Sequence, residues 1–312
     1  MLYFVINEKS RSGKGAAVWQ EVKGVLKERN IPYQAWTTAY EYQAIKLAED
    51  ICKQEDDDIC LVALGGDGTA NEVLNGITDF EKVRLGIIPT GSGNDFARGL
   101  KIKGTPKENL ERILTCMEMG PDAGERIDLG KVSWNHGENS RLFVISSGIG
   151  MDALVCKKAL TSKLKKALNK MHLGKLTYLF LTIYSLFSMD TADASVKYDE
   201  KGRRNLKKTI FSAVMNFPAE GGGVPMAPKA DARDGKFCVT SAYGVPKLIT
   251  FFYLIFLMAS RHEGLKGVDL TECRSCDYQI SKPMVLHADG EICGNVTDAH
   301  FECLPQKLRL LL

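Results

Sequence analysis

The stretch Leu61-Val62-Ala63-Leu64-Gly65-Gly66-Asp67-Gly68-Thr69, followed by Ala70-Asn71-Glu72, indicates the fold of the first third of the chain. An apolar strand leads into a glycine-rich turn, and a helix is predicted to follow with Thr69 as its cap. Glycines let a phosphate approach the backbone closely, and free N–H groups at a helix start attract anions. A carboxylate in such a turn repels phosphate unless a cation lies between them. Asp67 therefore predicts Mg²⁺, which prefers oxygen ligands; the alternative is a plain strand-to-helix turn.

The same order of strand, glycine-rich loop and helix recurs between Gly86 and Arg98, in the sequence GIIPTGSGNDFAR. Ser92 and the neighbouring amides are predicted to hold phosphate oxygens. Asp95 either caps the helix that follows or orients a metal-bound water. A third polar segment, residues 7–15, lies between a predicted strand and a predicted helix, but it lacks the spacing of a Walker A loop.

Strand-like and helix-like segments alternate along the first third of the chain, which predicts a parallel sheet covered by helices. The predicted strands are Leu2–Asn7, Ile59–Leu64 and Val83–Ile88, and the predicted helices are Ala16–Glu28, Gln43–Lys53 and Thr69–Gly76.

From about Ile127 the chain contains short strand-like runs separated by turn residues, which predicts an antiparallel β domain. Two helical insertions are expected, around 153–189 and 246–262. The predicted strands are Lys131–Trp134, Leu142–Ser146, Ile210–Asn216, Lys236–Ala242, Tyr278–Ser281, Met284–Leu286 and a last strand at Lys307–Leu312. We therefore predict an α/β nucleotide-binding domain over 1–128 and a β-rich lipid-binding domain over 129–299, with residues 300–312 able to return to the first domain.

Composition excludes several classes of protein. The formal net charge of +3 over 312 residues is too small to indicate nucleic-acid binding. Nine cysteines without a framework spacing predict reduced thiols and a cytoplasmic protein. The two most apolar runs, Tyr178–Met189 and Leu248–Ala259, are about 12 residues long, whereas a membrane-spanning helix needs about 20. The first residues, an apolar strand, do not resemble a signal peptide.

Together with later segments, these motifs resemble the diacylglycerol kinase catalytic-domain family, which includes sphingosine and ceramide kinases and bacterial lipid kinases. The first motif is also similar to those of NAD kinase and phosphofructokinase, so the first domain is expected to share their fold. The later segments that carry the resemblance are RIDLG at 126–130, GIGMDA at 148–153, GGG at 221–223, PKADARDGK at 228–236 and HADGE at 287–291.

The resemblance implies ATP and Mg²⁺ as cofactors and assigns roles to particular residues. ATP contacts are implied for Asn7, Ser12, Gly13, Thr38, Gly66, Asp67, Gly68, Thr69, Asn71, Glu72, Ser92 and Asn94. Asp67, Asp95 and Asp128 are implied to fix Mg²⁺ through water, and Asp231, Asp234 and Lys236 to hold a structural Mg²⁺. Either Asp289 or Glu291 takes the proton of the lipid hydroxyl, while Asp67 acts at the phosphates. Glu8 stands where the family commonly has proline.

The segment from Leu154 to Met189 holds seven lysines and no acidic residue, with leucines and a methionine among them. A basic, apolar segment of this kind predicts docking on an anionic membrane surface, and the alternative is a solvated helix face. The apolar run Leu248–Ala259 either lines an acyl cavity or belongs to the ordinary core. We expect a peripheral protein at the inner membrane surface that takes a lipid substrate, and a homodimer is compatible with this interpretation.

Two alternatives remain beside a lipid kinase, and a third, a dinucleotide-binding oxidoreductase, is rejected. An NAD kinase-like enzyme shares the first motif, and a non-catalytic lipid-binding module would bind lipid without ATP turnover. The fingerprint Gly148-x-Gly150-x-x-Ala153 literally fits a dinucleotide-binding oxidoreductase, but the acidic residue expected about 20 positions later is missing. Cys273 and Cys276 form only half of a zinc site.

Overall fold

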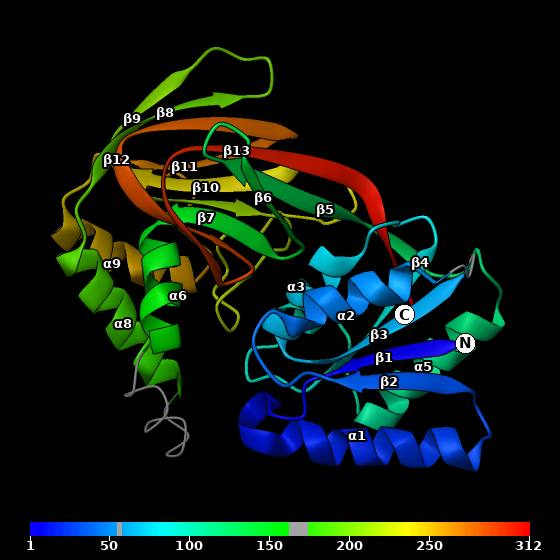
Figure 1. The fold of residues 1–312 in the computed structure, drawn as a ribbon. Coiled ribbons are helices and arrows are strands. Elements are labelled where there is room, and N and C mark those ends of the chain that lie inside the picture. The colour runs from blue at the N-terminus through cyan, green and yellow to red at the C-terminus, as the bar shows by residue number, and fades with distance from the viewer. Residues whose placement is uncertain (55–57, 162–173) are drawn as a thin grey trace. The chain divides into compact units, whose positions relative to one another are not determined.

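The computed structural model describes residues 1–54, 58–161 and 174–312. The chain forms two compact units, one of residues 1–129 with 305–312 and one of residues 130–304 (Figure 1). An α/β unit and a β-rich unit are thus both present, as the sequence predicted.

The first unit alternates strands and helices. Its elements are β1 Leu2–Ile6, α1 Ser10–Glu28, β2 Tyr33–Thr37, α2 Gln43–Cys52, β3 Ile59–Gly65, α3 Asp67–Gly76, β4 Val83–Pro89, α4 Asp95–Gly99 and α5 Pro106–Glu118. The unit also contains the start of β5 (Glu125–Trp134) and the end of β13 (Glu291–Leu310).

The strands β13-β4-β3-β1-β2 lie in this order, each parallel to its neighbour, and β5 also pairs with β13. β1 and β3 are fully buried, which matches their continuous apolar sequences. α1 and α5 share one core cluster with the sheet, whereas α2 packs with α3 on the other face (Figure 1). Because parallel strands end at one edge, this sheet brings the predicted motifs together there.

Three helix starts differ from the predictions. α1 begins at Ser10 rather than at Ala16, with a first turn made irregular by positive φ angles at Arg11 and Gly13. Gly66, not Thr69, is the N-cap of α3, because the helix already starts at Asp67. Asn94 caps α4, so Asp95 is its first helical residue and not the cap.

Two elements of this unit were missed by the sequence reasoning. β2 has a mixed exposure pattern because it is an edge strand that pairs only with β1. α5 does carry a local signal, a capping box between Thr105 and Glu108 with Pro106 at the first turn.

The second unit is antiparallel. Its elements are β6 Asn139–Phe143, β7 Ser146–Gly150, α6 Met151–Thr161, α8 Gly174–Ser188, β8 Ala192–Tyr198, β9 Arg204–Met215, β10 Phe237–Tyr243, α9 Lys247–Met258, β11 Val268–Cys273 and β12 Ser275–Ala288, with the remaining parts of β5 and β13. The strands run in the order β11-β10-β9-β7-β12-β13, while β8 pairs with β9 and β12. Figure 1 shows α6, α8 and α9 gathered on one side of these strands.

The predicted strand Leu142–Ser146 is wrong, because β6 ends at Phe143 and β7 begins at Ser146. The backbone N–H groups at this break donate to the carboxylate of Asp289 instead of to a neighbouring strand. Conversely, Tyr278–Ser281 and Met284–Leu286 belong to one long strand, β12. Among the described helices, none is both long and apolar enough to cross a bilayer.

Candidate active site

The two glycine-rich turns of the first unit lie against each other. β3 and β4 are in register with Gly65 opposite Pro89, so both turns leave the sheet at the same edge. The Thr90 N–H donates to the Gly65 carbonyl oxygen at 2.7 Å. A Cβ added to Gly91 would lie 2.8 Å from the Cα of Gly66, which leaves no room for a side chain. The motifs therefore form one continuous glycine-lined surface.

Polar side chains from the neighbouring strand ends surround this surface. The Asn7 Nδ2 donates to the Thr69 Oγ1 at 3.0 Å, and the Asn7 backbone N–H donates to the Leu64 oxygen at 2.9 Å. The hydroxyls of Ser10 and Thr90 lie 2.6 Å apart. Sequence reasoning missed Ser10 and Thr90, although both follow a predicted strand end directly.

Asp67 and Asp95 converge on Gly93. A Cβ at Gly93 would lie 3.2 Å from the Asp67 Oδ2 and 3.5 Å from the Asp95 Oδ2. The Asp67 carboxylate also accepts the backbone N–H groups of Asp95 (3.0 Å) and Phe96 (3.2 Å), which holds the start of α4. Arg98 donates to the Asp95 carboxylate and to the Gly93 carbonyl oxygen. Two carboxylates beside a glycine-lined phosphate surface are a donor set that fits Mg²⁺.

Asn94 supplies a side-chain oxygen that no described donor meets. It has φ 52° ahead of α4, and its Oδ1 is buried without a hydrogen-bond partner. An unpaired buried acceptor costs about 1–3 kcal/mol. A donor on a bound ligand, such as a metal-bound water, would satisfy it.

Several other predicted residues also reach this edge of the sheet. Gly66 and Gly68 flank Asp67 at the start of α3, Ser92 is exposed in the second turn, and Gly13 has φ 93° in the first turn of α1. Thr38 follows β2, and its hydroxyl donates to the Ile6 carbonyl oxygen at 3.3 Å. The side chain of Ser12 lies outside the described part of the structure.

Three predicted residues make contacts that hold the fold. Asn71 is fully buried, and its Oδ1 accepts from the Asn75 Nδ2. The Glu72 carboxylate accepts the Ala44 N–H at 3.1 Å, which caps α2 in place of a side chain from α2 itself. Asp128 is fully buried in β5 and accepts the Gln306 N–H at 2.7 Å. We assign these side chains to the framework of the site.

In the second unit, the Asp289 carboxylate accepts hydrogen bonds from the backbone at the break between β6 and β7. Its Oδ1 accepts the N–H groups of Ile145 (2.7 Å) and Ser146 (3.0 Å), and its Oδ2 accepts that of Val144 (2.8 Å). Its own N–H donates to the Ser146 carbonyl oxygen at 2.8 Å. Both oxygens are thus engaged by the backbone. Glu291, two residues later, begins β13 and is half-buried.

His287 supports the same turn. Its Nδ1 accepts the Gly290 N–H at 3.1 Å, so the neutral ring carries its proton on Nε2, which faces the Asp152 Oδ2 at 3.3 Å. A Cβ at Gly148 would lie 1.9 Å from that Asp152 oxygen, so this position requires glycine. Burial favours the neutral ring, but the Asp152 carboxylate outweighs it, with help from Glu220 and Asp289, and raises the pKa of His287.

Asp152, Glu220 and His287 bring ligand atoms within 4.8 Å of one another, and they are the one such group of three among the described residues. A metal on the Nε2 of His287 would need a proton on Nδ1, where the Gly290 N–H already points. The geometry therefore favours a hydrogen-bonded network over a metal site. Neither Cys273 nor Cys276 belongs to such a group.

The predicted structural Mg²⁺ site at Asp231, Asp234 and Lys236 has the geometry of an exposed turn. Asp231 is half-exposed and pairs with Arg233 at 3.4 Å. The Asp234 N–H donates to the Asp231 carbonyl oxygen, and the Lys236 N–H donates to the Asp234 Oδ1 at 2.9 Å. These hydrogen bonds close the turn without a cation.

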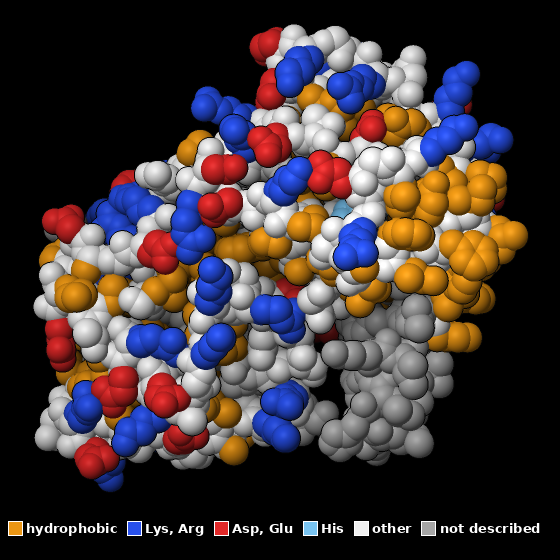
Figure 2. Space-filling model, turned by 180° about the vertical axis from the view of Figure 1, so that it is seen from behind, with side chains coloured by type: hydrophobic (Ala, Val, Ile, Leu, Met, Phe, Trp, Pro, Cys, Tyr) orange, Lys and Arg blue, Asp and Glu red, His pale blue; other side chains and the backbone are white. Residues whose placement is uncertain are grey.

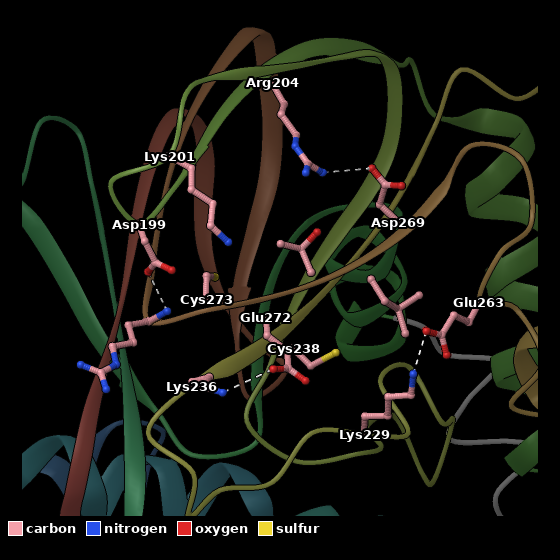
Figure 3. A pocket seen from close by; sticks show the side chains of 13 residues that line it. Asp199, Lys201, Arg204, Lys229, Lys236, Cys238, Glu263, Asp269, Glu272 and Cys273 are labelled. Carbon is pink, nitrogen blue, oxygen red and sulfur yellow. Dashed lines mark hydrogen bonds and ion pairs between the residues drawn. The ribbon is translucent and has the colours of Figure 1, made fainter.

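A surface hollow of about 690 Å³ in the second unit lies beside this turn (Figure 3). Of the candidate residues, only Lys236 lines it. Its charges are largely paired with one another: Lys229 with Glu263 at 2.8 Å, Lys236 with Glu272 at 3.4 Å and Arg204 with Asp269 at 3.9 Å. Because these charges neutralise one another, the hollow does not attract an anionic substrate strongly.

Comparison with known proteins places both units in families. Residues 1–125 match the diacylglycerol kinase catalytic domain, and residues 145–312 match the YegS C-terminal NAD kinase beta sandwich-like domain. YtlR of Bacillus subtilis, provisionally named a lipid kinase, is 26% identical over 310 residues, or 99% of this chain and 98% of YtlR. The diacylglycerol kinase of Bacillus subtilis is 29% identical over 237 residues, or 75% of this chain and 71% of that protein.

Solved structures show the same fold. A solved structure provisionally titled a diacylglycerol kinase from Bacillus anthracis superposes with a TM-score of 0.75 at 18% identity. The match covers 99% of this chain and 96% of that one.

Proposed function

Because this chain belongs to the lipid kinase family defined by a diacylglycerol kinase catalytic domain and a YegS C-terminal domain, we propose that it transfers the γ-phosphate of ATP to the hydroxyl of diacylglycerol and forms phosphatidic acid. Relatives named as diacylglycerol kinases support this choice of lipid. An NAD kinase-like activity is the second candidate, since the second unit matches a domain that is named for its likeness to NAD kinase.

The observation that carries the proposal is the convergence of Asp67 and Asp95 on Gly93, beside the two contacting glycine turns. Asp67 and Asp95 would hold Mg²⁺ through water, and the Asn94 Oδ1 would accept a hydrogen bond from one of these waters. When bound, the ion neutralises charge on the ATP phosphates. Asp128 stays a predicted member of this network; its carboxylate is buried and accepts the Gln306 N–H.

The chain's own residues do the positioning. The N–H groups at the start of α3 and in the Ser92 turn are suited to the phosphates, because a helix start carries partial positive charge. The hydroxyls of Ser10 and Thr90 and the Asn7–Thr69 pair hold the strand ends in place. Asn7, Ser12, Gly13 and Thr38 remain predicted ATP contacts.

Glu291 is the better candidate for accepting the proton of the lipid hydroxyl. Asp289 uses both of its oxygens to bind three backbone N–H groups, so it holds the turn from which Glu291 leaves. A positioned general base contributes about 10²- to 10⁴-fold to a rate.

We further propose that the enzyme takes its lipid at the surface of an anionic membrane, on the cytoplasmic side if its free cysteines reflect a reducing compartment. Lys157 and Lys158 of the basic segment lie on α6, whereas Lys163, Lys165, Lys166 and Lys170 lie outside the described residues. A homodimer and the structural Mg²⁺ at Asp231, Asp234 and Lys236 stay predictions.

The test is a radiolabelled-ATP assay with Mg²⁺ against diacylglycerol, other lipid alcohols and NAD. We expect labelled phosphatidic acid from the wild type, none from Asp67→Asn, and wild-type turnover from Asp122→Asn, a control at an exposed carboxylate of the same unit. Phosphorylation of NAD alone would replace the lipid kinase with the second candidate, and lipid binding without turnover would indicate a non-catalytic module.

A further inference from the structure

Two helices of the second unit expose large apolar side chains over one continuous area. On α8, Phe180, Tyr184 and Phe187 follow the i, i+4, i+7 spacing of one helix face, and each is about half exposed. Six further side chains are exposed on α9: Leu248, Ile249, Phe252, Ile255, Phe256 and Met258. Figure 2 shows these hydrophobic side chains gathered on the surface at the right of the view.

The opposite face of α9 packs against the core. Thr250 and Leu257 are buried, and Phe251 and Leu254 pack against the main core cluster of the unit. The helix is thus anchored on one side while Ile255, 66% exposed, and Met258, 61% exposed, point to solvent. Only one face of the apolar run Leu248–Ala259 therefore lies in the ordinary core, and the other face is exposed.

α8 and α9 adjoin each other, so their exposed faces form a single patch. The rings of Phe187 and Phe251 lie 6.5 Å apart, and the Lys247 Nζ donates to the Phe187 carbonyl oxygen at 3.3 Å. Monomeric soluble proteins rarely expose large contiguous apolar patches, and such patches mark interaction sites. We call these nine exposed side chains the α8–α9 patch.

Described cations lie beside the patch. Lys157 and Lys158 belong to α6, Lys247 begins α9 and Arg261 follows it, while Asp190 and Glu263 are the acidic residues next to α8 and α9 in the sequence. Lys158 lies on the rim, with its ammonium 4.0 Å from the centre of the Tyr184 ring.

We propose that the α8–α9 patch inserts into the interface of an anionic lipid bilayer, with its apolar side chains among the upper acyl chains and its cations among the headgroups. Helices with an apolar face and a basic rim lie in a membrane interface in this manner. A second copy of the chain fits less well, because a twofold contact would bring Lys158 and Lys247 close to the same cations of the other copy. The purpose of docking rests on the proposed lipid kinase function, but docking itself needs no ATP.

The test compares two double variants of the full chain. Phe252→Ser/Ile255→Ser removes two exposed side chains from the patch. Tyr40→Ser/Met119→Ser removes two comparably exposed side chains, 68% and 75%, from the first unit. Both variants change only exposed positions, and circular dichroism melts check that they fold.

Binding is measured by cosedimentation with vesicles of phosphatidylcholine and phosphatidylglycerol in equal parts. Burying one large apolar side chain in the bilayer strengthens vesicle binding by about tenfold. The patch variant lacks two such side chains and should therefore bind about 100-fold more weakly, while the control should bind as the wild type does. Sodium chloride at about 1 M, where the Debye length is about 3 Å, should weaken wild-type binding without abolishing it. Equal binding by the patch variant and the wild type would overturn the proposal.

Two further readouts separate the alternatives. Sedimentation velocity that shows a wild-type dimer and a monomeric patch variant would assign the face to a second copy and also overturn the proposal. On a short-chain diacylglycerol dispersed as monomers, the patch variant should keep wild-type kcat while losing activity on vesicles. If neither protein phosphorylates any lipid but the binding difference holds, the kinase proposal fails and the docking surface stands.

Discussion

Replacing Asp289 by asparagine tests whether this carboxylate holds the backbone in place or acts as the catalytic base. The amide keeps the size of the side chain and one acceptor oxygen, which can still bind the Ile145 and Ser146 N–H groups. On the other side, the NH₂ group would face the Val144 N–H, now 2.8 Å from Oδ2, and place donor against donor.

The expected cost follows from these contacts. A hydrogen bond to a charged group contributes about 1.5–3 kcal/mol, and a buried donor without a partner costs about 1–3 kcal/mol. One bond is lost and two are weakened, so we expect Asp289→Asn to lower the free energy of unfolding of this unit by about 3–4 kcal/mol. For a unit of this size, that corresponds to a melting temperature lower by about 10 °C.

Glu291→Gln is the partner experiment. This change should leave the melting temperature unchanged and lower kcat on diacylglycerol by about 10²- to 10⁴-fold, whereas Glu302→Gln, an exposed carboxylate on the same strand, should change neither. Melting is followed by circular dichroism and turnover by labelled ATP. An Asp289→Asn protein that melts like the wild type but has lost turnover, beside an active Glu291→Gln, would refute our assignment of the two roles.

Three more predictions follow from other contacts. Asp67→Asn should abolish Mg²⁺-dependent ATP binding in calorimetry and cost only about 1–3 kcal/mol of stability, because one of its two N–H contacts is lost; unchanged ATP binding would remove the metal role. Asp58→Ala should lower the free energy of unfolding in urea by about 3–5 kcal/mol, because Arg84 is 1% exposed and loses the carboxylate that accepts two of its hydrogen bonds. A decrease below about 1 kcal/mol would contradict this. Burial favours the neutral ring and protonation gives up the hydrogen bond from the Gly290 N–H to Nδ1, but the Asp152 carboxylate outweighs them and raises the pKa of His287. The protonated form therefore stabilises the fold at pH values below the ordinary value near 6.5, and this contribution is lost as the pH rises through the raised pKa. His287→Gln should therefore flatten the dependence of unfolding free energy on pH above about 6.5, and an unchanged slope would contradict the assignment.

The glycine motifs could be recognised from sequence because their physical requirements are local. An apolar strand, a turn that tolerates no side chain and a helix are all encoded within fewer than about twenty residues, as in Ile59–Gly76. Register then follows from topology, since parallel neighbours end together. For this reason, the pairing of the Gly66 and Gly91 turns was implied by the sequence, although their contact distance was not.

The remaining assignments depend on partners far away along the chain. Glu72 caps α2 across 28 residues, and Asp289 meets the Val144 N–H across 145 residues. No local pattern encodes either contact, so the sequence predicted a site role for both carboxylates without their structural contacts. Likewise, Leu248–Ala259 has the composition of a buried helix, and only the packing of the unit shows that half of it faces solvent.

Asp67 and Asp289 show why neighbours, rather than motif, decide what a carboxylate does. Each precedes a glycine, and each accepts backbone N–H groups. Beside Asp67 stands a second carboxylate, Asp95, which Arg98 contacts on its other oxygen, and a cation between Asp67 and Asp95 would relieve the remaining repulsion. Asp289 instead meets three N–H donors, which already balance its charge. The dipeptide Asp-Gly therefore supplies a metal-binding candidate in one unit, whereas in the other its carboxylate holds the backbone of a turn.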